Sequence, residues 1–173
     1  LGINGAGKTT TFKMLTGEFP PSAGDAIIQD RDGASYSVRT DLNDARRLMG
    51  YCPQFNGLQP NFTAREHIEF YAAIRGMPTE MIPRVTEDLL QRMGLTLYAD
   101  RQAGTYSGGN KRKLSVALSL VGEPEVVFLD EPSTGMDPEA RRFMWDVISS
   151  MMVGRTIVLT SHSMEECEAL CNR

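Results

Sequence analysis

The sequence predicts an α/β domain in which a helical insert separates two α/β parts. Three observations indicate this fold class. A glycine-rich loop leads into a helix at the start of the chain, and short apolar runs near its end are typical of buried parallel strands. The zone between them, about 61–122, has helical patterning. A helical insert between α/β halves accounts for this order of elements.

The first zone, residues 1–60, is divided by glycine, proline and turn residues. Gly17 and Gly50 each follow a helical pattern, as expected of residues that end a helix. The elements expected here are helices over 8–16 and 42–49, strands over 26–29 and 50–52, a turn over 30–33 and a loop over 53–60.

The central zone is predicted to hold three helices. Thr63 and Glu66 have the spacing of a capping box, which opens the first helix. The residues that continue it at helical spacing are His67, Phe70, Tyr71 and Ile74, before a stop at Gly76. Further helices are expected over about 79–93 and 109–121.

The last zone alternates strands and helices. Strands are expected over 126–129 and 156–160, and a helix over 138–152. Asp137 is the expected N-cap of that helix, with Pro138 in its first position. Ser163 and Glu166 have the spacing of a second capping box, which opens the final helix.

The composition is that of an ordinary globular domain and excludes several classes of protein. Hydrophobic residues make up 41% of the 173 residues, and the formal net charge is −4. The apolar runs are too short to span a bilayer, and there is no basic excess for non-specific nucleic-acid binding. Three cysteines are too few for a disulfide scaffold and indicate a reducing compartment. Cys167 and Cys171 are expected to be small apolar residues near the core.

Residues 2–9 read Gly-Ile-Asn-Gly-Ala-Gly-Lys-Thr and fit the phosphate-binding loop G-x-x-x-x-G-K-[ST]. The glycines let backbone N–H groups converge on phosphate oxygens, Lys8 supplies positive charge, and the Thr9 hydroxyl can bind Mg²⁺. The alternative is a chance match, against which stands the helix predicted directly after the loop. The residues expected to hold the nucleotide here are Asn4, Gly5, Ala6, Gly7, Lys8, Thr9 and Thr10.

Two acidic residues, Asp130 and Glu131, follow the strand predicted over 126–129. An acidic residue at the end of a buried strand is how phosphate-loop enzymes hold Mg²⁺ beside the nucleotide, so Asp130 is the expected metal partner, through water. Glu131 can then polarise the attacking water as a general base. Paired acids are also common in loops, so this assignment depends on the phosphate loop in the same chain.

The segment Tyr106-Ser-Gly-Gly-Asn110 predicts a second anion site at the start of a helix. Gly108 and Gly109 expose backbone N–H groups, and Ser107 adds a hydroxyl. The alternative is a plain helix N-cap with a flexible lead-in. One nucleotide does not need two distant anion sites in a monomer. We therefore expect two domains to face each other head to tail, each offering residues 107–109 to the nucleotide that the other holds.

Together these motifs resemble the nucleotide-binding domain of an ATP-binding cassette (ABC) transporter over essentially the whole chain. The resemblance rests on the phosphate loop, Tyr51-Cys-Pro-Gln54, Ser107-Gly-Gly, Asp130-Glu-Pro, Ser133-Thr-Gly-Met-Asp137 and Thr160-Ser-His162, all in the family's order. It implies a P-loop NTPase fold with an ABC-type ATPase core. Its expected parts are a parallel sheet, a small antiparallel β part and a helical subdomain over about 61–122, within a single domain over 1–173.

The resemblance also implies roles for single residues. Gln54 resembles the Q-loop glutamine, which touches Mg²⁺ and water. Asp137 resembles an aspartate that works across the dimer interface, and His162 resembles the switch histidine that contacts the γ-phosphate. With ATP and Mg²⁺ as the implied cofactors, the expected catalytic residues are Glu131, His162 and Gln54, and the expected metal site is Thr9, Gln54 and Asp130.

Asn110 stands where most of the family has glutamine, and its surroundings resemble subfamily A, whose members mostly move lipids. The implied function is ATP hydrolysis that powers transmembrane transport, with lipid export as the expected case, at the cytoplasmic face of a membrane. The implied partners are a second nucleotide-binding domain, in the same polypeptide or another, and transmembrane domains; nucleic acid is not among them. Phe55 and residues 61–94 are the expected contact with the membrane domain.

Three other functions stay open at this point: an ATPase subunit of a drug or polysaccharide exporter, an ABC-type ATPase that transports nothing, and a module that binds ATP but hydrolyses it poorly. The chain begins with Leu rather than Met, so we expect a domain truncated at both ends. The family's strand before the phosphate loop and its adenine-stacking aromatic residue both lie upstream of residue 1. We therefore expect these 173 residues alone to be poorly stable.

Overall fold

A three-stranded parallel sheet forms the centre of the computed structural model, which describes residue 2 and residues 5–171. Its strands are β3 (Met49–Cys52), β4 (Val126–Asp130) and β5 (Thr156–Thr160), in the order β3-β4-β5. Met49 pairs with Val126, and Val126 pairs with Thr156. The parallel sheet expected of the P-loop NTPase fold is therefore present, and both strands predicted in the last zone belong to it.

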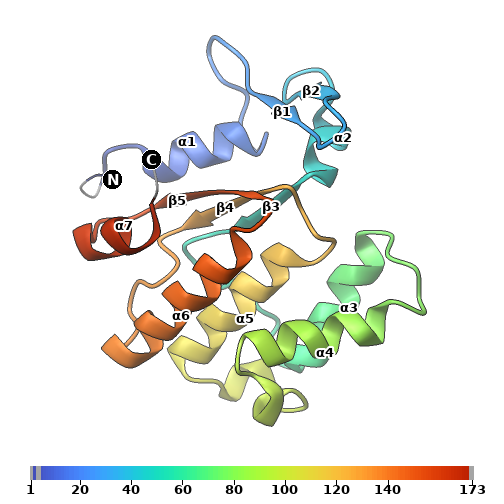
Figure 1. The fold of residues 1–173 in the computed structure, drawn as a ribbon, viewed down its shortest axis with the longest axis vertical. Helices are drawn as coiled ribbons and strands as arrows, with labels where there is room; N and C mark the ends of the chain where they lie inside the picture. The colour runs from blue at the N-terminus through green and yellow to red at the C-terminus, as the bar shows by residue number, and fades with distance from the viewer. Residues whose placement is uncertain (1, 3–4, 172–173) are drawn as a thin grey trace.

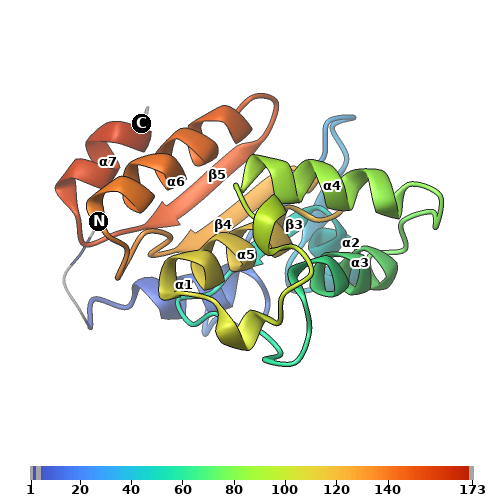
Figure 2. The ribbon, with the colours of Figure 1, turned by 90° about the horizontal axis from the view of Figure 1, so that it is seen from below.

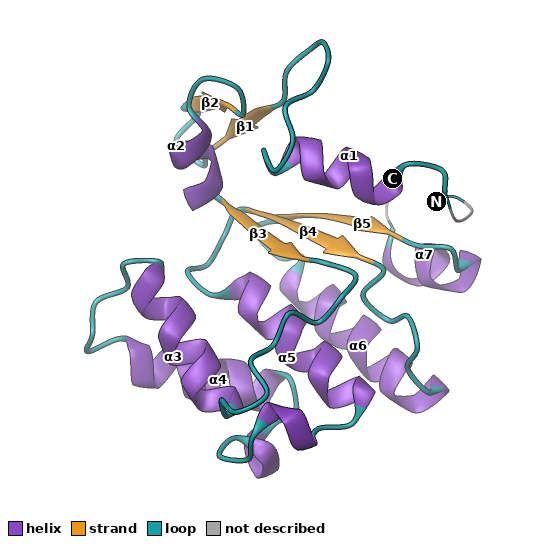
Figure 3. Ribbon diagram, turned by 180° about the vertical axis from the view of Figure 1, so that it is seen from behind, coloured by secondary structure: helices purple, strands orange, loops and turns teal. Residues whose placement is uncertain are grey.

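Helices cover both faces of this sheet (Figure 1). One face carries α1 (Lys8–Leu15), whereas α5 (Gly108–Leu120) and α6 (Pro138–Met151) lie on the other face, as Figure 3 shows from behind. The last helix, α7 (Met164–Leu170), follows β5 and packs against α6. The start of α1 and the carboxyl ends of the strands lie at the same end of the molecule, which is where parallel sheets bind ligands.

A small antiparallel hairpin lies beyond α1. It pairs β1 (Ile27–Gln29) with β2 (Ser35–Ser37), and α2 (Leu42–Arg47) follows it. The first strand and the turn at 30–33 were predicted by the sequence, but β2 was not. Its residues are Ser-Tyr-Ser, and the tyrosine side chain packs against the small core beneath the hairpin. One apolar residue in three is too short a pattern to predict a strand.

The helical insert lies to one side of the sheet. Helices α3 (Ala64–Ile74) and α4 (Ile82–Arg92) pack against each other, and α3 also contacts α5 (Figure 2). Two short 3₁₀ helices, η1 (Thr96–Tyr98) and η2 (Ala103–Thr105), connect the pair to α5. The capping box of α3 is present as predicted: Thr63 N donates to Glu66 Oε2 over 2.8 Å, and Glu66 N donates to Thr63 Oγ1 over 3.1 Å.

Two apolar cores stabilise these layers. The smaller lies between the sheet and α1, where the rings of Phe12 and Phe128 meet edge to face with centroids 5.4 Å apart. The larger lies between the other face of the sheet, α5, α6 and the helical insert. Its largest fully buried side chains include Ile68, Leu90, Leu114, Leu129 and Met144.

Gly50 does not end a helix, contrary to prediction. Helix α2 ends at Arg47, and Gly50 lies inside β3. A Cβ atom at Gly50 would come within 1.9 Å of the Ser119 carbonyl oxygen of α5. The glycine therefore allows helix and strand to pack closely, which a sequence pattern does not distinguish from a helix stop.

The apolar face predicted for α3 is largely exposed. Ile68 and Ala72 pack into the core, whereas 51% of Phe70 and 67% of Ile74 is accessible to solvent. The helix prediction is confirmed, and His67 is buried as the predicted face required. The rest of the buried face consists of Ala64, Ile68 and Ala72 rather than the predicted large side chains.

The three cysteines differ in burial, and Cys167 in α7 is partly buried. Cys52 is fully buried in β3, whereas Cys171 is exposed just after α7, so its expected place near the core is wrong. Helix α7 ends one residue before Cys171, which leaves that side chain outside the helix face that packs inward. None of the helices in the part of the chain that the structure describes is long and apolar enough to cross a membrane.

Candidate functional site

The site begins at the N-terminus of α1. Gly7 is the N-cap residue, with a left-handed φ of 83°, and Gly5 has a φ of 82°. Such angles are open to glycine but costly for other residues, so the sequence Gly-Ala-Gly permits this loop shape. Among the described residues no side chain caps the helix, and its first turn carries no acidic residue. The free backbone N–H groups and the helix dipole therefore favour an anion here.

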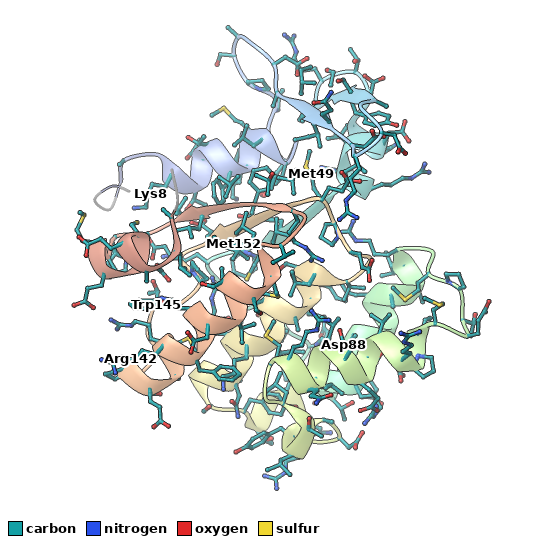
Figure 4. The ribbon with its side chains drawn as sticks, viewed as in Figure 1. Lys8, Met49, Asp88, Arg142, Trp145 and Met152 are labelled. Atoms are coloured by element: carbon teal, nitrogen blue, oxygen red, sulfur yellow. The ribbon has the colours of Figure 1, made fainter. Side chains whose placement is uncertain are left out.

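Lys8 lies at this end of α1, as labelled in Figure 4. Its Nζ donates a hydrogen bond to the Gly2 carbonyl oxygen over 2.6 Å and lies 3.6 Å from Glu131 Oε1. Only 12% of its side chain is exposed. The ammonium group is thus held between the loop before α1 and the carboxylate after β4.

Asp130 joins α1 to two strands of the sheet. Its Oδ2 atom accepts a hydrogen bond from Thr9 Oγ1 over 2.7 Å, and its Oδ1 atom accepts a short one from Thr160 Oγ1, at the end of β5. The residue is fully buried. A hydroxyl and a carboxylate side by side are hard oxygen donors, which is the donor set that Mg²⁺ prefers.

Glu131 is the most connected side chain of the site. Its Oε2 accepts hydrogen bonds from Gln54 Nε2 over 3.1 Å and from Thr134 Oγ1 over 3.2 Å, and it lies 3.5 Å from His162 Nδ1. Its backbone has a φ of 51°, a left-handed value that costs about 1–3 kcal/mol for a residue other than glycine. Strain of this size persists only where the surroundings impose it.

A cavity of about 320 Å³ brings these groups together. It is lined by Gly5, Ala6, Gly7, Lys8, Thr9, Thr10, Gln54 and Glu131. Eight of the predicted site residues therefore surround one space, although they come from three separate segments of the chain. Asp130 contacts Thr9 of this group, and His162 contacts Glu131. The predicted Asn4 lies outside the described residues.

The second predicted anion site lies apart from this cavity. Ser107 is the N-cap of α5, and its Oγ accepts a hydrogen bond from Asn110 N over 3.2 Å. Asp137 is the N-cap of α6, where the hydrogen bond from Ala140 N lowers the pKa of its carboxyl. A Cβ atom on Gly109 would lie 3.9 Å from Met136 Cε, so the two segments adjoin each other. Neither segment lines the cavity at Lys8.

Sequence reasoning missed several residues that hold the site together. Thr160 and Thr134 bind the two acidic side chains, and Arg112 is buried beneath both loops. A signal for Arg112 was available: it shares a helical face with Ser115, Val116 and Ser119, all of them buried. A cation on the buried face of a helix needs partners in the interior.

Glu166 differs from its predicted role. The Ser163 side chain does accept a bond from Glu166 N, but the Glu166 carboxylate does not complete the capping box. Its Oε1 instead accepts bonds from Ser133 Oγ over 2.6 Å and from Trp145 Nε1 over 3.2 Å. Because the carboxylate is buried, these two donors outcompete the exposed backbone of the cap. Glu166 therefore ties α7 to α6 and to the segment after Glu131.

Comparison with known proteins places this geometry in a family. The family model described as "ABC transporter" matches residues 1–134. The retinal-specific phospholipid-transporting ATPase ABCA4 of Bos taurus is 58% identical over all of this chain, and the phospholipid-transporting ATPase ABCA7 of Homo sapiens is 54% identical. This chain spans only 7% and 8% of those two proteins.

Two solved structures share the fold. The cbiO1 subunit of the ABC transporter complex cbiONQ from Clostridium perfringens superposes with a TM-score of 0.83 at 29% identity, over 99% of this chain and 69% of that one. The ATP-binding subunit of another ABC transporter gives a TM-score of 0.80 at 27% identity, over 99% and 70%. Both superpositions cover the hairpin, the sheet and the helical insert.

Proposed function

The chain belongs to the ABC transporter family, and from this premise we propose that it binds ATP and hydrolyses it to drive transport across a membrane. The observation that carries the proposal is the cavity at the start of α1, where Lys8, Gln54 and Glu131 converge. A helix N-terminus with a lysine suits the phosphates, and a buried carboxylate beside it suits a water molecule.

The chemistry follows from the side chains of the cavity. Backbone N–H groups of residues 5–10 and the Lys8 ammonium bind the phosphates and take up charge that develops on the γ-phosphoryl group. Glu131 accepts the proton of water as the water oxygen attacks the γ-phosphorus, and the bond from that phosphorus to the β-phosphate oxygen breaks. Gln54 orients the carboxylate through its hydrogen bond, and His162 stands on its other side. ADP and inorganic phosphate leave.

Thr9 and Asp130 are the residues that would hold Mg²⁺, with Gln54 at the edge of the same cavity. The bound ion supplies positive charge that stabilises the transferred phosphoryl group. The Thr160 hydroxyl keeps the Asp130 carboxylate turned toward Thr9, because it binds the other carboxylate oxygen. This support from behind is what a metal-binding carboxylate requires.

The second nucleotide-binding domain is proposed to pair head to tail with this one. The start of α5, residues 107–109, and Asp137 adjoin each other but do not line the cavity at Lys8. Ser107, Gly108 and Asp137 are exposed at the starts of the two helices, so a ligand or partner outside the domain can reach them. Their proposed place is opposite the nucleotide that the partner domain holds.

We propose a single domain over 1–173, with a helical subdomain over about 61–122. The transmembrane domains are proposed to dock on its exposed apolar patch, which consists of Phe55, Phe70, Tyr71 and Ile74. Tyr71 and Ile74 line a cavity of about 220 Å³ together with residues 56–57, which follow Gln54. A partner seated there would contact both the helical insert and the loop that carries Gln54. This surface would therefore transmit movement between the membrane and the nucleotide, at the cytoplasmic face.

Phospholipid is the proposed transported substrate, because the similar proteins from Bos taurus and Homo sapiens are named as phospholipid-transporting ATPases. The test is reconstitution of the full-length protein that contains this chain into liposomes with a fluorescent phospholipid. We expect hydrolysis of Mg²⁺-ATP and movement of the lipid between leaflets that requires ATP. Hydrolysis without lipid movement would contradict the substrate, and the absence of hydrolysis would contradict the ATPase.

A further inference from the structure

Arg112 lies in the second turn of α5 and is 3% exposed. Its guanidinium donates to the carbonyl oxygens of the last residue of β4 and of the two residues after it. Nη2 binds the Asp130 oxygen over 2.5 Å and the Glu131 oxygen over 3.1 Å, and Nε binds the Pro132 oxygen over 3.0 Å. Three successive carbonyl groups thus converge on one side chain.

The same guanidinium also binds the loop after β3. Nη1 donates to the Pro53 oxygen over 2.5 Å and to the Gln54 oxygen over 3.3 Å. These two residues are far in sequence from Glu131, but their backbones meet at Arg112. Both ends of the hydrogen bond between Gln54 Nε2 and Glu131 Oε2 are therefore fixed to one buried group.

The geometry of these contacts needs arginine. A planar guanidinium presents N–H groups in several fixed directions, whereas an ammonium is a single point with three donors. Successive carbonyl groups of a regular strand point in alternate directions. Three successive carbonyl oxygens can therefore face one guanidinium only where the backbone departs from the strand conformation. The left-handed φ of Glu131 supplies that change, and the bonds from Arg112 stabilise it.

We propose that Arg112 is a positioning residue that sets Gln54 and Glu131 against each other and fixes both to α5. The consequence rests on the proposed function. The first turn of α5 carries residues 107–109, which would face the nucleotide of the partner domain. A displacement of α5 on binding that nucleotide would move the main chain at Gln54 and Glu131 directly. Arg112 would then make hydrolysis in one site responsive to the occupancy of the other.

Hydrogen exchange on the full-length protein without nucleotide tests the positioning itself. In Arg112→Ala we expect amides in 54–59 and in 131–136 to exchange about tenfold faster or more, in both loops together. Amides of the β1–β2 hairpin and of α7 should stay within about twofold of wild type. Arg142→Ala, which removes an exposed arginine of α6, is the matched control (Figure 4). Unchanged exchange in the two loops, or an equal rise throughout the domain, would overturn the proposal.

ATP hydrolysis by the full-length protein gives the second readout. With kcat expressed per titrated nucleotide-binding site, Arg112→Ala should lower kcat about tenfold or more and leave KM for ATP within about threefold. Arg112→Lys should recover part of kcat, because it keeps the charge but not the fork of donors. A purely structural role would reduce the number of binding sites and leave kcat per site unchanged, which would overturn the proposal. If wild type does not hydrolyse ATP, the proposed function fails while the exchange experiment still decides the role of Arg112.

Discussion

The N-termini of α1 and α5 differ in how their first turns are capped. Glycine residues lie at both, in the Gly-Ala-Gly loop before α1 and in the Ser-Gly-Gly segment at the start of α5. At α1, no side chain among the described residues caps the helix, and Lys8 and Thr9 reach the acidic residues at the end of β4. At α5, the Ser107 hydroxyl caps the helix itself. The first end is thus without a cap in the described part of the chain, whereas the second has one from its own sequence.

This difference shows how one backbone feature can serve two purposes. The N-terminus of α1 lines a cavity together with Lys8 and Glu131, and Asp130 contacts Thr9 beside it. These are the groups that we propose act on a bound nucleotide. The N-terminus of α5 adjoins the segment around Met136 and Ala140 instead. We propose that this end faces a nucleotide held by the partner domain, so substitutions at the two ends should have different effects.

Glu131→Gln should have the largest effect, because it removes the base at the α1 end and keeps the shape of the side chain. We expect kcat for ATP hydrolysis to fall about 10²-fold to 10⁴-fold, as for loss of general base catalysis, with ATP affinity nearly unchanged. The measurements are steady-state hydrolysis and ATP titration on the full-length protein. Wild-type turnover in this variant would assign the base to another residue.

Lys8→Ala should weaken nucleotide binding itself. A charge-assisted hydrogen bond contributes about 1.5–3 kcal/mol, so the dissociation constant for ATP should rise about 10-fold to 100-fold. Titration with ATP measures this change, and Lys111→Ala near the α5 end is the matched control. Equal losses in both variants would mean that the α1 end is not the primary nucleotide site.

Two substitutions at Ser107 separate its capping role from anion binding. Ser107→Ala should lower the free energy of unfolding by about 1 kcal/mol through loss of the N-cap. Ser107→Asp should keep the cap but place negative charge where the partner's phosphate is proposed to lie, so stability is retained and hydrolysis falls. Thermal melts and ATPase assays on the full-length protein measure both. Full activity in Ser107→Asp would argue against an anion at this helix.

The smallest expected effect concerns pH and the cap of α6. The pKa of Asp137 is lowered in the folded state by the hydrogen bond from Ala140 N. Because the pKa of this carboxyl is lower in the folded chain than in the unfolded chain, its ionised form stabilises the fold at any pH above the unfolded-state pKa. That stabilisation is lost as the pH falls through the folded-state pKa. The melting temperature of wild type should therefore exceed that of Asp137→Ala at pH 7, and the gap should close below about pH 4. A gap that persists at pH 2 would show another cause.

Most of the elements were predictable because their signals are local. Capping residues, glycine stops and apolar runs predicted all seven α-helices and four of the five strands of the described chain close to their places, but neither of the two 3₁₀ helices. Strand β2 was not predictable, because its three residues are ordered by the hairpin rather than by their own pattern. The role of Gly50 and the buried face of α3 depend on contacts with α5, which a local pattern does not contain.

The candidate site was predictable where a motif carries the chemistry in adjacent residues. The phosphate loop and the acidic pair are of this kind, and the structure brings them to one cavity with Gln54. The groups that orient them were not predictable. Arg112 binds backbone oxygens, and Thr160 binds a side chain thirty residues away. Thr134 lies only three residues from Glu131, but no motif assigns it a partner. Motifs report the residues that touch a ligand better than those that hold such residues in place.

The register of the sheet has a consequence for synthesis on the ribosome. Met49 of β3 pairs with Val126 of β4, so the sheet cannot begin to form until the whole insert between them has been made. Non-local strand pairing of this kind forms slowly, because the chain loses the entropy of closing the loop before any contact between the strands compensates for it. Helices α3 and α4, which contact each other locally, can form while β3 still lacks a neighbour. During that interval β3 is an unpaired strand, and chaperones that shield such edges would matter most there.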